Sequence, residues 1–263
     1  MSELRRLLVD NERLRVSSSL DGLISLKKEE KHYLRNVIRL NRGNLIAVIN
    51  GQGQYWEAEI ISKESIRLRT NFDKPAYKKV PPSPFLGLAV TQPKKDFETI
   101  LRMSTEIGVD IIQPLISIRS VVNSFNENKF LRWQGIIKEA VEQCERLWIP
   151  EVNKPLNVLE WFSMLNKNDA CAFANTRNDC YCYLPDWLNN LAPEINTVWI
   201  VIGPEGGWDS KEQSYVVRHG CDFISLGNFI MRTSTAAISA TQLLVNWREE
   251  SNFVKRYPNS SRD

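Results

Sequence analysis

The sequence predicts an α/β protein in which a mostly parallel α/β domain follows a small β-barrel. Residues 1–74 contain short segments with the period-two alternation of antiparallel strands. Residues 75–84 are rich in proline and polar residues, which indicates an extended linker. From residue 85 onward, apolar strand candidates alternate with amphipathic helices, which is typical of a mostly parallel sheet. The chain has 263 residues, enough for one large or two small domains.

In the first domain, residues 1–74, the strands are expected to be short and antiparallel. The strand candidates are residues 45–49, 56–60 and 66–69, with a turn at residues 51–53 and a short helix around residues 29–38. Residues 1–80 hold 16 Lys and Arg against 10 Asp and Glu, whereas the whole chain has a net charge of only +3. This excess of positive charge favours a phosphate-binding surface, although solvated basic residues are common on any protein.

The second domain is expected to span residues 85–250, with a polar tail at residues 251–263. The strand candidates are residues 85–90, 109–118, 171–174, 197–202 and 223–226. A helical stripe runs from Phe97 to Ile107 and ends at Gly108, in the position where glycine often terminates a helix. Further amphipathic helices are expected at residues 130–144 and 236–247.

Two glycine-containing segments follow strand candidates. The first, Ile202–Trp208, comes after an apolar strand and precedes a capping-box spacing that starts at Ser210. The second, Leu226–Ala236, comes after a short strand, and Thr233 or Ser234 is expected to cap the helix that follows. Because ligands of open α/β sheets bind at the carboxyl ends of the strands, we expect both loops to form one pocket.

The loops lack the signatures of two common nucleotide sites. A phosphate-binding P-loop would end in Gly-Lys-Ser/Thr, and the first loop does not. The Gly-x-Gly-x-x-Gly run of a dinucleotide fold is absent from the sequence. A largely uncharged pair of glycine loops is suited to an adenosine, held by backbone hydrogen bonds while Leu226, Ile230 and Met231 pack on the base. From the pattern alone, two ordinary strand-to-helix turns explain the loops equally well.

Several further motifs follow one another in a specific order. Besides the two loops they are His32–Leu40, Pro93–Lys95, Ser104–Asp110, Arg119–Val122 and Glu139–Cys144. Together they resemble the small-subunit ribosomal RNA uridine-N3 methyltransferases of the SPOUT superfamily, over nearly the whole chain. The resemblance implies a PUA-like RNA-binding barrel and a carboxy-terminal SPOUT-type domain with a trefoil knot. It also implies S-adenosyl-L-methionine as cofactor, no metal, 16S ribosomal RNA of the small subunit as substrate, and a homodimer.

The resemblance, the charge pattern and the chemistry of the expected reaction together give three groups of candidate site residues. The catalytic candidates are Arg232, whose permanent charge could stabilise negative charge on the uracil carbonyl oxygens, and Glu205; a structural salt bridge is the alternative for Arg232. The expected cofactor-binding residues are Phe173, Ala174, Ile202, Gly203, Pro204, Glu205, Gly206, Leu226, Gly227, Ile230, Met231, Thr233 and Ala236. The expected RNA-binding residues are Arg5, Arg6, Arg13, Arg35, Arg39, Lys94 and Arg119.

One residue of the second loop departs from the family pattern. The family usually has Arg-Thr-Glu-Thr where this chain has Arg232-Thr233-Ser234-Thr235. Methylation at N3 of uridine requires either a base for the N3 proton or groups that stabilise the resulting negative charge. A serine hydroxyl does not accept that proton as a carboxylate does, which leaves Glu205 as the acid/base or hydrogen-bond acceptor.

Three functions stay open at this point. The leading one is S-adenosylmethionine-dependent methylation of N3 of a uridine in 16S ribosomal RNA. The second is a catalytically weak RNA-binding or ribosome-assembly protein of the same fold, and the third is a SPOUT methyltransferase with another RNA target. The sequence has no apolar stretch of about 18 residues and no apolar core near its start, so a cytoplasmic protein without a membrane partner is expected. Five cysteines without a Cys-x-x-Cys pair argue against a zinc site or a disulfide framework.

Overall fold

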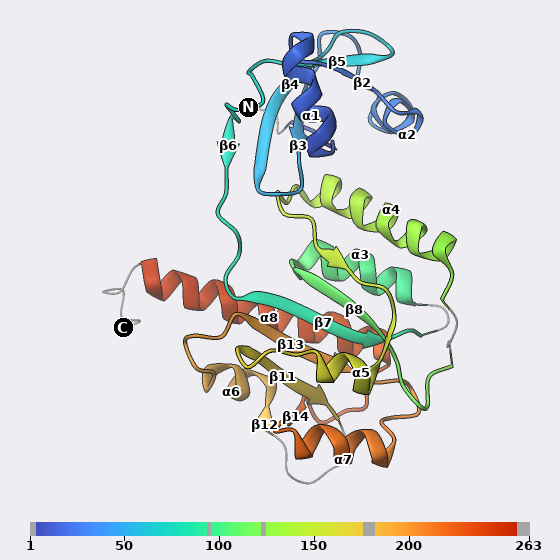
Figure 1. The fold of residues 1–263 in the computed structure, drawn as a ribbon, viewed down its shortest axis with the longest axis vertical. Coiled ribbons are helices and arrows are strands. Elements are labelled where there is room, and N and C mark those ends of the chain that lie inside the picture. The colour runs from blue at the N-terminus through green and yellow to red at the C-terminus, as the bar shows by residue number, and fades with distance from the viewer. Residues whose placement is uncertain (1–3, 94–95, 122–124, 176–181, 257–263) are drawn as a thin grey trace. The chain divides into compact units, whose positions relative to one another are not determined.

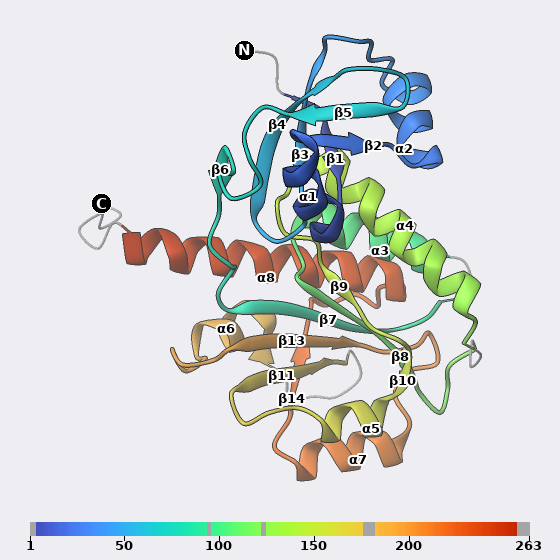
Figure 2. The same cartoon turned by 45° about the horizontal axis from the view of Figure 1, so that its top comes forward.

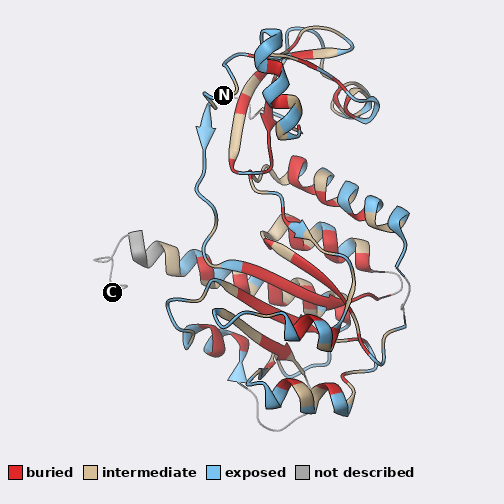
Figure 3. Ribbon diagram, viewed as in Figure 1, coloured by how far each residue is buried: buried red, intermediate tan, exposed pale blue. Residues whose placement is uncertain are grey.

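The computed structural model describes residues 4–93, 96–121, 125–175 and 182–256 (Figure 1). The chain forms two compact units. The first unit contains Met1–Pro81 and Lys138–Ile149, and the second contains Pro82–Ile137 and Pro150–Asp263. Each unit has its own sheet, and buried residues follow the strands of both sheets (Figure 3).

The sheet of the first unit has six strands. Their order is β1 (Arg6–Leu8), β3 (Leu45–Ile49), β4 (Gln54–Ile60), β5 (Ser65–Leu68) and β2 (Leu23–Ser25), and β6 (Tyr77–Lys78) pairs with β4. β1 runs parallel to β3, and the other pairs are antiparallel. The alternating residues Trp56, Ala58 and Ile60 are buried, as their spacing in β4 predicts. Within the expected linker at residues 75–84, β6 pairs with β4, so this part of the segment belongs to the first sheet.

The helical segments of the first unit are short. They are α1 (Asn11–Ser17), the 3₁₀ turn η1 (Ser18–Leu20), α2 (Lys28–His32) and the π-helical turn η2 (Tyr33–Val37). The last two together form the helix expected around residues 29–38. Asp10 caps α1, and its carboxylate accepts the backbone N–H of Arg13 at 2.9 Å. The sequence does not predict α1, β1 or β2, since segments of three to seven residues carry little periodic signal.

The end of helix α4 (Glu127–Cys144) is part of the first unit. The buried Glu142 accepts the backbone N–H of Leu8 in β1 at 2.8 Å, and Glu145 lies 3.4 Å from Arg6. The sequence placed this segment in the second domain, whereas the structure groups residues 138–149 with the first unit. These long-range contacts join positions more than 130 residues apart, which no local pattern encodes.

Glu142 makes the stability of the protein depend on pH. Burial, the largest cause, raises the pKa of its carboxyl to about 7. Between about pH 4.5 and pH 7, the carboxyl of Glu142 is still protonated in the folded state but has already lost its proton in the unfolded state. The contribution of this group to the free energy of unfolding therefore falls as the pH rises through that window. Glu142→Gln keeps an acceptor for Leu8 without the charge. We expect the variant to become more stable than wild type by about 3 kcal/mol at pH 8 and by almost nothing at pH 4.5.

Urea denaturation across this pH range measures the effect. The control is Glu139→Gln on the same helix, where the carboxylate is exposed and the expected change is small at every pH. A constant difference between Glu142→Gln and wild type from pH 4.5 to pH 8 would contradict the prediction.

The sheet of the second unit has eight strands, and all its pairings are parallel. The order is β10 (Leu156–Asn157), β8 (Ile111–Ile116), β7 (Phe85–Thr91), β13 (Thr197–Ile202), β11 (Asp169–Ala174), β14 (Asp222–Ser225) and β12 (Cys182–Tyr183), with β9 (Glu151–Val152) paired to β8. The five expected strands are β7, β8, β11, β13 and β14. The predicted class, a mostly parallel α/β domain with a small β domain before it, is confirmed.

Helices cover both faces of this sheet. α3 (Phe97–Ile107) and α8 (Thr233–Arg256) pack together on one face, and α5 (Val158–Ser163) and α7 (Ser210–Arg218) pack together on the other (Figure 2). α6 (Leu184–Asn189) contacts α8 and β14. Because α8 continues to Arg256, the expected polar tail begins inside a helix, and residues 257–263 lie outside the described part. Within the described residues, no helix has the length and apolar character needed to cross a membrane.

Candidate cofactor-binding and catalytic site

The two predicted loops leave the sheet at the ends of neighbouring strands. β13 ends at Ile202 and β14 ends at Ser225, and β11, which ends at Ala174, lies between them. All three run parallel, so their carboxyl ends meet at one edge of the sheet. The first loop, residues 203–209, and the second loop, residues 226–232, therefore lie side by side, as the sequence predicted.

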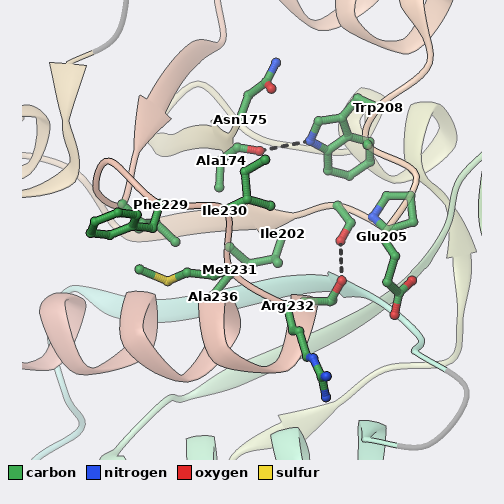
Figure 4. A pocket seen from close by; sticks show the side chains of 15 residues that line it. Ala174, Asn175, Ile202, Glu205, Trp208, Phe229, Ile230, Met231, Arg232 and Ala236 are labelled. Carbon is green, nitrogen blue, oxygen red and sulfur yellow. Dashed lines mark hydrogen bonds between the residues drawn. The ribbon is translucent and has the colours of Figure 1, made fainter. Parts of the chain in front are cut away.

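A pocket of about 310 Å³ lies between the loops (Figure 4). Its lining comes from the ends of β11 and β13, from both loops and from the start of α8. The lining residues are Ala174, Asn175, Ile202, Gly203, Pro204, Glu205, Gly207, Trp208, Leu226, Phe229, Ile230, Met231, Arg232, Thr233 and Ala236. The pocket is thus built by segments that are up to 62 positions apart in the sequence.

Two hydrogen bonds hold the first loop in place. The indole N–H of Trp208 donates to the carbonyl oxygen of Ala174 at 3.1 Å, and the hydroxyl of Thr233 donates to the carbonyl oxygen of Gly203 at 3.0 Å (Figure 4). Trp208 is only 4% exposed and packs on Phe173, with ring centroids 5.0 Å apart. The loop is consequently anchored to β11 on one side and to the start of α8 on the other.

The outer side of the first loop is held by Arg119. Its guanidinium donates to the carbonyl oxygen of Gly206 at 3.1 Å and lies 3.4 Å from the carboxylate of Asp209. Asp209 in turn caps helix α7, and Glu212 completes the capping box. The sequence placed this cap one residue later, at Ser210; aspartate and glutamate form the box because their carboxylates accept backbone N–H groups well.

The two ends of the pocket differ in chemistry. Phe229 and Ile230 are 83% and 71% exposed, and together with Met231 they form an apolar end (Figure 4). Glu205, also exposed, lies at the opposite end in Figure 4, and Arg232 extends away from the apolar side chains. Within the described residues, the guanidinium of Arg232 has no hydrogen bond or ion pair. This arrangement offers an apolar surface to a flat base and a charged region to a polar reactant.

The start of helix α8 differs from the prediction in its capping. The helix begins at Thr233, and the hydroxyls of Thr233 and Ser234 bond to residues outside the helix. The hydroxyl of Thr233 bonds to Gly203, and the hydroxyl of Ser234 donates to the carboxylate of Asp96 at 3.3 Å. Both side chains are used for tertiary contacts, which local capping preferences do not encode.

Most of the expected cofactor-binding residues line the pocket, and three do not. Phe173 is buried in the core behind Trp208. Gly206 faces Arg119, and Gly227 has a φ of +145° in a turn held by the Ser225 hydroxyl. The assignment of these residues to a cofactor stays a prediction.

The pocket also contains four residues that the sequence analysis did not assign to it, namely Asn175, Gly207, Trp208 and Phe229. Asn175 directly follows a strand that ends at the pocket, which is the one signal that could have identified it. The burial of Trp208 and its indole hydrogen bond place it in the wall of the pocket. The exposure of Phe229 depends on tertiary structure and has no sequence signal.

The expected RNA-binding residues have different surroundings. Arg5 and Arg39 are exposed, and Arg35 is half-buried. Arg13 forms a two-pronged pair with the buried Glu30, at 2.6 and 2.9 Å, and Arg6 pairs with Glu145. Arg119 holds the first loop, and Lys94 lies outside the described residues. Their contacts with RNA stay predictions. Within the described residues, no cluster of His, Cys, Asp and Glu has the arrangement of a metal site.

Comparisons with known proteins agree with this architecture. Residues 81–245 match the model of an RNA methyltransferase domain, and residues 26–70 match the model of an RNA methyltransferase PUA domain. The chain is 31% identical over 222 residues to ribosomal RNA small subunit methyltransferase E of Synechocystis sp., which covers 82% of this chain and 71% of that protein.

Two solved structures share the fold. A methyltransferase of Legionella pneumophila, solved with its bound cofactor SAM, superposes with a TM-score of 0.76 at 26% identity, over 92% of this chain and 97% of that one. The small subunit methyltransferase E of Neisseria gonorrhoeae has a TM-score of 0.75 at 22% identity, over 93% and 98% of the two chains. On the strength of the match over residues 81–245 and of the relative from Synechocystis, this chain belongs to the RNA methyltransferase family that its motifs resemble.

Proposed function

We propose that the protein transfers a methyl group from S-adenosylmethionine to N3 of a uridine in 16S ribosomal RNA of the small subunit. The observation that carries this proposal is the single pocket between the two glycine loops, at the carboxyl ends of three adjacent parallel strands. The relatives named ribosomal RNA small subunit methyltransferase E support the class of substrate. The SAM complex of the Legionella protein supports the cofactor.

The pocket residues fit an adenosine-containing cofactor. Leu226, Ile230 and Met231 provide apolar surface for the adenine, and the backbone of Ile202 and Gly203 provides hydrogen-bonding groups. Gly207 lines the pocket with a φ of +71°, and a Cβ built there meets no atom within 4 Å. The first loop therefore presents open space where a ligand can approach the backbone.

The remaining groups fit a methyl transfer to a uracil nitrogen. The cofactor supplies a methyl group on a sulfonium, whose transfer requires little more than alignment of the attacking atom. Loss of the N3 proton places negative charge on the two flanking carbonyl oxygens. Arg232, exposed and without an intramolecular ion pair among the described residues, can stabilise that charge, and Glu205 can accept a hydrogen bond or a proton at the same end.

The first unit is proposed to hold the RNA. It contains the match to the PUA domain model, and its exposed Arg5 and Arg39 are available to phosphates. N3 of a paired uridine is engaged in base pairing, so the target nucleotide has to be unpaired or turned out of its helix. We further propose that the protein acts in the cytoplasm and that it forms a homodimer. Analytical ultracentrifugation of the purified chain tests the dimer directly.

Gly203 provides a test of the cofactor pocket. A Cβ at this position would lie 2.8 Å from Cε2 of the buried Trp208, so Gly203→Ala has to displace the indole that anchors the loop. We expect S-adenosylmethionine to bind at least about tenfold more weakly, as measured by calorimetry. The control is Gly135→Ala in α4, where a Cβ meets nothing within 4 Å. Equal affinities of the two variants would contradict the role of this loop.

Product mapping tests the function itself. Purified protein is incubated with methyl-labelled S-adenosylmethionine and small subunits that lack modification, and the labelled nucleoside is identified by mass spectrometry after digestion. N3-methyluridine supports the proposal. A label on another nucleoside, or on transfer RNA, would favour a different RNA target. No label despite measurable cofactor binding would favour an RNA-binding assembly protein of the same fold.

A further inference from the structure

The carboxylate of Asp96 does not cap the helix that it precedes. The residue occupies the N-cap position of α3, where an aspartate commonly accepts a backbone N–H of its own helix. Its side chain makes no such capping bond. Instead, the carboxylate accepts the hydroxyl of Ser234 at 3.3 Å, from a helix 138 positions further along the chain. The structure thus directs this carboxylate away from local capping and toward the start of α8.

The start of α8 is also the charged end of the pocket. Arg232 precedes the helix, Thr233 bonds to Gly203 of the first loop, and Ser234 is the next residue. The amino terminus of a helix carries partial positive charge, which attracts a carboxylate. Asp96 does not line the pocket itself, but its carboxylate is hydrogen-bonded to Ser234, two positions after the pocket residue Arg232.

N3 methylation requires a proton acceptor at that end. Arg232 cannot accept a proton at any relevant pH, and a serine hydroxyl is a poor base, whereas a carboxylate accepts one readily. Glu205 is exposed, and within the described residues its carboxylate has no hydrogen bond or ion pair to hold it. Asp96, by contrast, is half-buried and held by Ser234. A base that is held in position is more effective than a free one.

We infer that Asp96 accepts the N3 proton of the target uridine and that Ser234 positions its carboxylate; this inference rests on the proposed function. In the step, the N3–H bond breaks and its proton moves to the carboxylate of Asp96. The electron pair left on N3 forms the new bond to the methyl carbon. The carbon–sulfur bond breaks with its electrons going to sulfur, which becomes a neutral thioether, so atoms and charges balance.

The test measures single-turnover methyl transfer by the full-length protein to unmodified small subunits, with enzyme and labelled S-adenosylmethionine in excess. Asp96→Asn keeps an oxygen for the Ser234 hydroxyl but removes the base, so we expect the rate of N3-methyluridine formation to fall about a hundredfold. The affinities for S-adenosylmethionine and for RNA should stay within about twofold of wild type. Glu98→Gln is the matched control, because Glu98 lies on the same helix and pairs with Arg132 at the surface.

A reciprocal exchange separates a base from a structural contact. Asp96→Ser combined with Ser234→Asp moves the carboxylate to the other side of the same hydrogen bond. We expect this double variant to transfer the methyl group at least tenfold faster than Asp96→Asn. A wild-type rate in Asp96→Asn would overturn the inference and leave the proposed function intact. Loss of cofactor affinity in Asp96→Asn would make the residue structural and would also overturn it. If the wild type labels another atom, the proposed function and this inference both fall.

Discussion

Arg248→Met is expected to lower the free energy of unfolding by about 3–5 kcal/mol, because it removes the guanidinium that pairs with the buried carboxylate of Asp110. Arg248 of α8 forms a buried ion pair with Asp110. The guanidinium also donates to the carbonyl oxygens of Pro84 at 3.3 Å and Gly108 at 3.2 Å. The carboxylate of Asp110 accepts the backbone N–H of Leu86 at 2.9 Å. Arg248 and Asp110 thus join α8 to the start of β7 and to the turn after α3.

The double variant distinguishes this mechanism from a loss of packing. Arg248→Met combined with Asp110→Asn removes both charges, and the amide still offers an oxygen to the N–H of Leu86, so we expect it to be more stable than Arg248→Met alone. Arg102→Met is the surface control, since Arg102 and Glu106 form an exposed pair on α3 worth about 0.5 kcal/mol at most. Urea denaturation measures all three. A double variant no more stable than the single one would rule out the buried charge of Asp110 as the cause.

The sequence predicts the strands of the second unit because they are buried on both faces. Thr197–Ile202 and Phe85–Thr91 are continuous apolar runs, which is how parallel strands covered by helices on both sides read. Close packing between them depends on detail that a pattern does not show. Gly87 in β7 lies opposite Trp199 in β13, and a Cβ there would lie 2.2 Å from the indole ring. This glycine makes room for a neighbouring strand's side chain rather than for a turn.

The candidate site could be predicted only where it follows strand ends. Both loops were found because glycine follows an apolar strand, and sheet order then brings them together. The contact between Ser234 and Asp96 joins positions 138 apart, and the sequence alone interprets Ser234 as a helix cap. Arg13 was expected on RNA, yet it is paired with Glu30 inside the first unit. Residue type indicates what a side chain can do, and tertiary contacts decide which of these options is used.

Arg232→Ala is expected to slow methyl transfer about 10²- to 10³-fold, the usual effect of removing one group that stabilises developing negative charge. Arg232 lines the pocket and extends from the start of α8 away from the apolar end. Within the described residues its guanidinium has no internal partner, so the charge is free to act on a substrate. The stability of the fold should therefore change little, and S-adenosylmethionine should bind within a few-fold of wild type, since the loss arises in the transition state.

The nature of the substitution tests whether geometry or charge matters at Arg232. Lysine keeps the charge but lacks the planar fork of the guanidinium, so Arg232→Lys should recover only part of the lost rate. Arg218→Ala, at the end of α7 and outside the pocket, is the control and should methylate at the wild-type rate. Single-turnover methyl transfer at saturating cofactor and RNA measures the rates of Arg232→Ala, Arg232→Lys and Arg218→Ala. Full activity in Arg232→Ala would exclude this residue from charge stabilisation and would favour the backbone N–H groups at the start of α8 in that role.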